Sequence, residues 1–420
     1  MKMKYAPRGW NSWDCYGAAV TEEIVIKNAE YMARNLKEAG YEYVVVDIQW
    51  YEPNADNNEY HPFTELCMDE YGRLIPAVNR FPSSADGQGF KPLADYVHSL
   101  GLKFGIHIMR GIPRQAVTQN TPVLGTNVTA RQIAKTASIC AWNTDNYGVD
   151  PTKEGARAYY DSIFALYASW GVDFIKCDDI CRELPHEEEE LIMLSEALHN
   201  CGRDMVLSLS PGPALLEKAE LYKQISNMWR ITDDFWDEWR LLYDMFERAE
   251  KWSIHAGNGH FPDADMLPVG AIRQVYDVNN VTRFTQNEQI TMMLLWCIMR
   301  APLMIGAEMT KNDEFTLDLL SNPGLMDMQE NSRHAHQVFR RKIGDNEIIL
   351  WTAMKAGGGQ YVAVFNVDGP KCDITIDLAE LELEGDIAVA DIMASGAISF
   401  YRDVMQVEID EHCGRGFLIQ

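Results

Sequence analysis

The sequence predicts an α/β fold, a (β/α)8 TIM barrel followed by an antiparallel β-sandwich. Through most of the 420 residues, short apolar runs alternate with helical patterns, which favours parallel strands joined by helical crossovers. Eight such runs occur and no glycine-rich phosphate turn follows an early strand, so a closed barrel fits better than an open sheet. After about Gln337, short strands at close spacing predict a sandwich. We therefore expect a barrel over residues 1–337 and a sandwich over 338–420.

The composition is that of an ordinary globular protein, with 47% hydrophobic and 24% charged residues. The net charge of -25 argues against partners such as nucleic acid and anionic membrane surfaces, which would repel the chain. No signal peptide is visible at the start, and no apolar run is long enough to span a bilayer. Nine cysteines without a CxxC pair predict reduced thiols in the cytoplasm. The oligomeric state stays open, and a homo-oligomer is compatible with the sequence.

The first half of the barrel is expected to contain four strands, at 9–14, 41–50, 102–109 and 172–178. Helices are expected at 21–37, which Thr21 caps and Gly40 follows, and at 90–100 and 152–169. Two connections are long. The segment 51–82 is too long for a tight turn, so it is a candidate wall of a site, and 111–147 is a second excursion.

The second half is expected to contain strands at 205–210, 225–231, 252–256 and 303–306, with helices at 187–199, 214–221, 235–251 and 287–300. The helix at 187–199 begins with four glutamates, which predicts first-turn charge facing water rather than a metal site. Strands of the sandwich are expected at 347–352, 360–367, 372–377, 386–393, 398–401, 404–409 and 416–419.

The strand at 172–178 carries the most informative residues. Lys176 and Asp178 are two apart, so their side chains point to the same side of the strand, at the end where barrels hold their chemistry. A lysine keeps a neighbouring carboxylate ionised, which suits a nucleophile. On these two residues alone, a salt bridge without chemistry is an equal alternative.

A second carboxylate group follows the strand at 225–231. Beyond Arg230 come three aspartates, at 233, 234 and 237, among aromatic residues. A carboxylate acid/base opposite a charged nucleophile is the arrangement that a retaining glycosidase needs. On composition alone Asp233 and Asp237 compete for that role, and aspartates at this point are also ordinary helix caps.

Further acids and tryptophans are expected at the same end of the barrel. Asp263 and Asp265 follow in the next loop, and Asp47 lies at the tip of the second strand. Trp13 and Trp50, near the ends of the first two strands, can stack on a pyranose ring. Acids at four strand ends, together with tryptophans, indicate a sugar pocket.

These stretches resemble glycoside hydrolase family 27, the α-galactosidases and α-N-acetylgalactosaminidases, from Gly9 to about Gln337. The motifs that carry the resemblance are GWNSW at 9–13, K-x-D at 176–178, R-x-x-x-D at 230–234 with Trp239 beyond, D-x-D-M-L at 263–267, and LLWCIMRAPLMIGA within 289–307.

The resemblance implies hydrolysis of terminal α-D-galactosyl residues by double displacement with retention, without a metal or an organic cofactor. It makes Asp178 the nucleophile and Asp234 the acid/base, and its spacing decides against Asp233. The sugar-contacting residues that we expect are Trp13, Asp47, Trp50, Lys176, Ser210, Arg230 and Asp265.

Three departures from the family pattern bear on the substrate. The family usually has two aspartates at the tip of strand two, the second binding the axial hydroxyl and its neighbour, whereas this chain has Asp47 and Ile48. Ile180 replaces a family cysteine, so the usual disulfide is expected to be absent. Ser210 leans towards an α-N-acetylgalactosaminidase, where α-galactosidases carry a glutamate.

Other interpretations remain open. A β-L-arabinopyranosidase is an alternative, because that sugar is galactose without its hydroxymethyl group and the altered strand-two tip would set such a preference. A metal-dependent barrel hydrolase is disfavoured because His107 stands alone without an H-x-H or H-x-x-x-H pattern. A non-catalytic sugar-binding protein would be expected to lack Asp178 or Asp234, and both are present.

Overall fold

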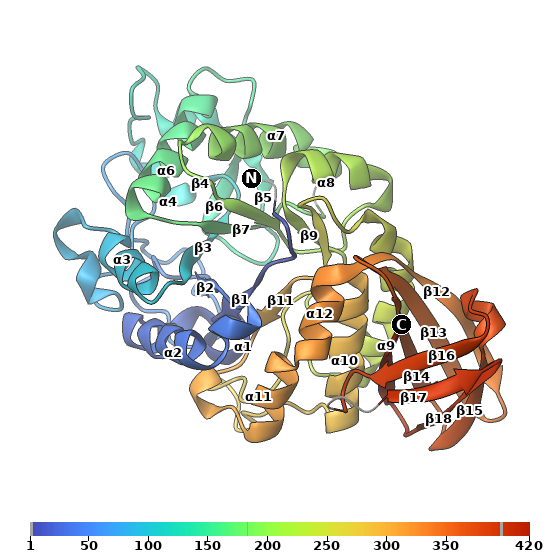
Figure 1. Cartoon of the computed structure of the whole chain (residues 1–420). Helices are drawn as coiled ribbons and strands as arrows, with labels where there is room; N and C mark the ends of the chain where they lie inside the picture. Colours follow the sequence, from blue (N-terminus) through green and yellow to red (C-terminus); the bar gives the residue numbers. More distant parts are fainter. Residues whose placement is uncertain (1–2, 183, 395–397) are drawn as a thin grey trace.

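The computed structural model describes residues 3–182, 184–394 and 398–420. Its first part is a parallel barrel (Figure 1), in which the sheet follows the order β10-β9-β8-β7-β3-β2-β1-β11. A parallel bridge between Leu267, just after β10, and Ile305 in β11 closes the ring. The barrel strands are β1 (Arg8–Asn11), β2 (Tyr43–Val46), β3 (Lys103–Met109), β7 (Phe174–Asp178), β8 (Val206–Leu209), β9 (Met228–Arg230), β10 (Phe261–Asp263) and β11 (Leu303–Ile305).

Helices connect these strands as crossovers, so the predicted (β/α)8 class is confirmed. They are α2 (Glu22–Asn35), α3 (Lys91–Ser99), α6 (Ala156–Trp170), α7 (Leu184–Asn200), α8 (Ala219–Ile225), α9 (Trp239–Trp252) and α10 (Gln286–Met299). A short α1 (Trp13–Tyr16) replaces the second half of the first predicted strand. Most of the connecting helices bury an apolar face against the strands, and the apolar α10 is buried along most of its length.

The seventh barrel strand does not lie where the sequence predicts it. Residues 252–256 end α9 and form a 3-10 turn, η5 (Ser253–His255), and the strand is β10, in the segment that was expected to be the loop carrying Asp263 and Asp265. Trp252 is buried because it closes the apolar face of α9 and packs 6.1 Å from Trp229, ring to ring. The strand itself is three residues long with Pro262 at its centre, so its sequence carries a weak β signal.

The acidic start of α7 is also different from the prediction. Glu187 and Glu190 are buried rather than facing water. The buried guanidinium of Arg110 draws them inward, with Nη1 3.1 Å from the Glu190 carboxylate. Asp179 completes this cluster, 2.7 Å from Nη2 of the same arginine.

The two long excursions meet above the barrel. Residues 111–149 form α4 (Arg114–Gln119), α5 (Ala130–Ile133) and a small sheet of β4 (Ile112–Pro113), β6 (Asn146–Val149) and β5 (Ala134–Ile139). The backbone N–H of Phe63 donates to Thr144 Oγ1 at 2.7 Å, which ties the 51–82 segment to this excursion. Together they wall the mouth of the barrel.

The C-terminal part is an eight-stranded antiparallel sheet, reached through α11 (Glu314–Ser321) and α12 (Pro323–Asn331). Its order is β12-β13-β14-β19-β16-β17-β18-β15, and its strands enclose an apolar core of their own. The strands are β12 (Ser332–Ile343), β13 (Asn346–Lys355), β14 (Gln360–Asp368), β15 (Cys372–Asp377), β16 (Asp386–Asp391), β17 (Ile398–Arg402), β18 (Val404–Ile409) and β19 (Gly414–Ile419).

The outer face of this sheet packs on the barrel through Trp351 and Phe365, with α10 and α12 between the two parts (Figure 1). Strand β12, which the sequence analysis did not predict, begins at Ser332 and therefore runs across the expected boundary at residue 337. We propose that the second unit begins with this strand.

Candidate active site

A cavity of about 290 Å³ opens at the carboxyl ends of the barrel strands. This is the size at which small-ligand pockets begin. Seven of the nine predicted site residues line it: Trp13, Asp47, Lys176, Asp178, Arg230, Asp234 and Asp265. They come from five different strand ends or the loops that follow them, so the barrel brings together residues that are far apart in the sequence.

Asp178 is the buried carboxylate at the end of β7. Its Oδ2 lies 3.0 Å from Nε2 of His107 on the neighbouring strand β3. Burial alone would raise the pKa of Asp178, but the hydrogen bond with His107 and the charges of Lys176 and Arg230 outweigh it and hold the pKa well below its usual value. The residue is therefore an ionised, partly desolvated carboxylate, as a nucleophile must be.

Lys176 links Asp178 to the strand-two tip. Its Nζ donates to Oδ2 of Asp47 at 2.8 Å, and Asn11 Nδ2 donates to the same oxygen at 2.6 Å. Burial opposes the charge on Lys176, yet the Asp47 and Asp178 carboxylates raise its pKa above the usual value. The Lys176 ammonium can donate a hydrogen bond to one sugar hydroxyl, and the adjacent Asp47 carboxylate can accept a hydrogen bond from the neighbouring one.

Arg230 joins the second carboxylate group. Its Nη2 donates to Asp234 Oδ1 at 2.8 Å, and its Nη1 lies 2.7 Å from Asp265 Oδ1. Asp265 is buried and Asp234 is open, with 62% of the Asp234 side chain exposed. Burial raises the pKa of Asp265 to about 7, although Arg230 opposes the rise.

A carboxyl group that the sequence analysis did not select also lines the pocket. Asp14 follows Trp13, is 2% exposed, and its Oδ2 has no hydrogen-bond partner among the described residues. Burial and the nearby Asp265 carboxylate raise the pKa of Asp14 well above its usual value, which favours the protonated form, and that form can donate a hydrogen bond. The signal in the sequence that could have indicated Asp14 is its position directly after the GWNSW motif at 9–13.

An aromatic wall closes one side of the pocket. Trp13 stacks on Tyr60 with ring centroids 5.7 Å apart, and Tyr60 packs against Trp142 at 5.6 Å. Tyr60 belongs to the 51–82 segment, so the prediction that this segment walls the site is confirmed. Tyr60 and Trp142 lie in irregular segments, where no periodicity could have indicated them.

Two predicted sugar-contacting residues lie outside the pocket. Trp50 is fully buried in an aromatic cluster with Phe90 and Trp170, and its Nε1 donates to the His107 carbonyl at 2.8 Å. Ser210 is 1% exposed and lines a small cavity inside the barrel, which shares Lys176, Arg230 and Asp265 with the pocket but does not make Ser210 part of its lining. The structure therefore does not bring either side chain to the substrate pocket.

The other aspartates after β9 have different surroundings. Asp237 is buried and accepts from both Nη atoms of Arg273, at 2.7 and 2.8 Å, so it is a structural ion pair away from the pocket. Asp233 lies at the rim, where it accepts from Arg182 at 3.0 Å with 65% of its side chain exposed. Asp234 lies between them in the chain and is the one that contacts Arg230.

Within the described residues, no group of three or more His, Cys, Asp or Glu side chains is placed to hold a metal ion. None of the helices in the same ranges combines the length and apolar character that crossing a bilayer requires. All nine cysteines are unpaired thiols in the structure.

Carboxylates at the carboxyl ends of barrel strands, one buried and one open to solvent beside an aromatic wall, suit the hydrolysis of glycosidic bonds. The family model for α-galactosidase A matches residues 11–151 and 143–330. The chain belongs to glycoside hydrolase family 27, and it is an enzyme of that family.

Solved structures of the family resemble this chain along its whole length. A β-L-arabinopyranosidase from Geobacillus stearothermophilus is 54% identical, with a TM-score of 0.96 over 99% of this chain and 96% of that one. A Bacillus halodurans protein provisionally assigned as an α-N-acetylgalactosaminidase is 50% identical, with a TM-score of 0.88 over 100% and 99%. Plant relatives are more distant: the α-galactosidase of Coffea arabica is 27% identical over 98% of this chain and 93% of its own.

Proposed function

We propose that this enzyme is an exo-acting retaining β-L-arabinopyranosidase. Asp178 attacks the anomeric carbon, and the bond between that carbon and the leaving oxygen breaks as Asp234 gives the oxygen a proton. Asp234 then takes a proton from water, and this water releases the sugar from Asp178. Lys176, Asp47, Arg230 and Asp265 bind the hydroxyl groups, and Trp13 packs on the ring.

The observation that carries this choice of sugar is Ile48 in the pocket. Its side chain is 1% exposed and lines the cavity directly after Asp47. In the family pattern an aspartate stands here and binds the axial hydroxyl and its neighbour. An isoleucine cannot accept a hydrogen bond, so a buried hydroxymethyl group beside it would be left unpaired, at a cost of about 1–3 kcal/mol. An arabinopyranoside has no such group and does not incur this cost.

The similar enzyme from Geobacillus stearothermophilus, with its printed activity on β-L-arabinopyranosides, supports the same choice. The argument for an N-acetylgalactosaminide is weaker, because it rests on Ser210, which is buried outside the pocket. An α-galactosidase is the second candidate. The family model and the curated relatives favour it, and its substrate differs only by the hydroxymethyl group.

The unpaired cysteines are compatible with the reducing cytoplasm, which we propose as the location. The substrate would then be a small imported saccharide.

A panel of three nitrophenyl glycosides tests the sugar: the β-L-arabinopyranoside, the α-galactoside and the α-N-acetylgalactosaminide. We expect the highest kcat/KM for the first. A higher value for the α-galactoside would replace the proposal by the second candidate, and hydrolysis of none would refute both.

The mechanism is tested with Asp178→Ala. We expect turnover to be abolished and then restored by azide, with a glycosyl azide of inverted configuration as product. Near-normal turnover of this variant, or an inverted sugar from the native enzyme, would refute the assignment of Asp178 as the nucleophile.

A further inference from the structure

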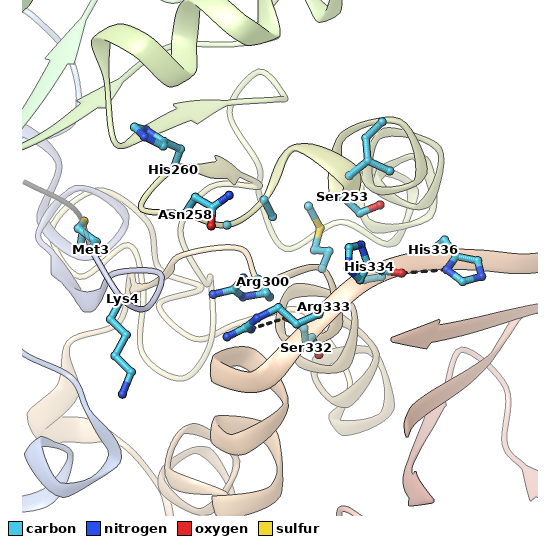
Figure 2. Close-up of a pocket in the computed structure, with 15 residues that line it drawn as sticks. Met3, Lys4, Ser253, Asn258, His260, Arg300, Ser332, Arg333, His334 and His336 are labelled. Carbon is cyan, nitrogen blue, oxygen red and sulfur yellow. Dashed lines mark hydrogen bonds between the residues drawn. The ribbon is translucent and has the colours of Figure 1, made fainter. Parts of the chain in front are cut away.

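A second and larger cavity, of about 1140 Å³, lies at the other end of the barrel (Figure 2). Asn258 and His260 precede β10, and Arg300 precedes β11, so these residues lie at the amino ends of their strands. The active site lies at the carboxyl ends. The opposite wall of the cavity is the start of β12, with Ser332 and Arg333. The cavity therefore lies at the junction of the barrel and the C-terminal sheet.

The charge of this cavity is opposite to that of the protein. The chain has 62 acidic and 37 basic residues, yet none of the described residues that line the cavity is acidic. Its lining includes Lys4, Arg300 and Arg333 together with the histidines at 260, 334 and 336. Such a local excess of positive charge on a protein of net charge -25 indicates a place built for an anion.

The strongest single observation in favour of an anion site is the environment of Arg300. It is 5% exposed, and its side chain makes no hydrogen bond or ion pair that the structure records within residues 3–182, 184–394 and 398–420. Its guanidinium lies over the Phe261 ring, 5.4 Å from the centroid. Gly257 leaves room beside it, because a Cβ at Gly257 would lie 3.1 Å from Nη1. Burial and the charge of Arg333 lower the pKa of Arg300 to about 10, and an uncompensated buried charge is costly.

Arg333 and Ser332 add further donors from the sheet. Nη1 of Arg333 donates to the carbonyls of Glu330 and Ser332, at 2.9 and 2.7 Å, and both of these partners are backbone atoms. The Ser332 hydroxyl is buried and has no partner among the described residues. Figure 2 shows Arg300 and Arg333 lining the same cavity, and the charge of Arg333 acts on the Arg300 guanidinium. The two guanidinium groups repel each other, and an anion bound between them would offset that repulsion.

We propose that this cavity is a binding site for the phosphate group of a small organic phosphate. Two guanidinium groups and a hydroxyl match the oxygens of a phosphate, which guanidinium binds through paired hydrogen bonds. The cavity is large enough for an organic part beside the phosphate. Because Arg300 belongs to the barrel and Arg333 to the sheet, the bound anion would also join the two parts.

The test is calorimetric titration of the native protein with glucose 6-phosphate, inorganic phosphate and, as the control anion, chloride at equal ionic strength. We expect saturable binding of the phosphates and a raised Tm in their presence. Tighter binding of glucose 6-phosphate than of inorganic phosphate identifies an ester as the ligand class, and equal binding identifies free phosphate. Either result supports an anion site. No binding at about 10 mM phosphate or ester would overturn the proposal.

Substitutions locate the site. Arg300→Gln and Arg333→Gln should each weaken phosphate binding by about tenfold or more. Arg333 is only half-buried, so its variant should fold even if Arg300→Gln does not. The matched control is Arg341→Gln, because Arg341 lies in the same strand β12 but outside the cavity, paired with Glu380 at 2.7 Å. Equal phosphate affinity in Arg333→Gln and Arg341→Gln would show that the anion binds elsewhere. Hydrolysis without phosphate should be unchanged in Arg333→Gln, since the active site is at the other end of the barrel.

Discussion

Replacing Ile48 by aspartate should shift the enzyme from the arabinopyranoside towards the α-galactoside. The new carboxylate would lie in the pocket directly after Asp47, where it could accept from the hydroxymethyl group. A hydrogen bond to a charged group is worth about 1.5–3 kcal/mol. Since each 1.4 kcal/mol is about tenfold, the ratio of kcat/KM for the α-galactoside to that for the arabinopyranoside should rise by about 10- to 100-fold.

The substitution also has a cost that the controls must separate from specificity. Ile48 is buried, and Lys176 already forms an ion pair with Asp47. A second carboxylate at position 48 would therefore have no cation of its own and should lower the stability of the fold. Ile48→Asn offers hydrogen bonds without the charge, and Ile48→Val keeps the site apolar. We expect an intermediate ratio for Asn and the native ratio for Val. The reasoning is refuted if Ile48→Asp binds and cleaves both glycosides in the native ratio, or if Val moves the ratio as far as Asp does.

Three further substitutions test the rest of the site. Arg230→Lys cannot span both Asp234 and Asp265, so kcat/KM should fall about 100-fold on the preferred nitrophenyl glycoside; a change below about threefold would contradict this. Asp178→Asn removes a carboxylate whose pKa is lowered in the folded protein. The ionised carboxylate stabilises the fold at pH values above its unfolded pKa of about 3.9, and this stabilisation is lost as the pH falls below that value. The variant's Tm should therefore drop less than that of the native protein between about pH 5 and pH 3, and equal drops would argue against it. Trp50→Phe should lower stability by about 1–3 kcal/mol, because the hydrogen bond to the His107 carbonyl is lost, and should leave KM unchanged. A raised KM would show that Trp50 contacts the sugar after all.

Seven of the nine site residues that the sequence predicted line the pocket, partly because strand geometry determines where side chains point and partly because the family motifs single them out. Lys176 and Asp178 lie on one side of β7 by the two-residue period, and parallel strands bring their carboxyl ends to one end of a barrel. The spacing from Arg230 to Asp234 lets one side chain reach the other across four residues. None of this needed knowledge of the long loops.

The sequence could not predict what lies beyond the strands. Trp50 comes four residues after β2 ends, where the strand period no longer applies, and it turns into the aromatic core instead of the pocket. His107 is on a strand, but its hydrogen bond with Asp178 forms only because β3 pairs with β7, and the sequence alone does not show which strands pair. The position of β10 was missed for a similar reason, because a three-residue strand is recognised by its partners rather than by its own residues.

The two proposed catalytic aspartates show how surroundings give one residue type two functions. Asp178 is buried among cations and a histidine, so it stays ionised and loses much of its water, which favours attack on carbon. Asp234 has 62% of its side chain exposed and contacts one cation, Arg230. A group that must give up a proton and later regain one from water needs that access to solvent, which a fully buried carboxyl such as Asp265 lacks. The division of labour therefore follows from depth in the barrel: the nucleophile lies on the strand, and the acid/base lies in the loop above it.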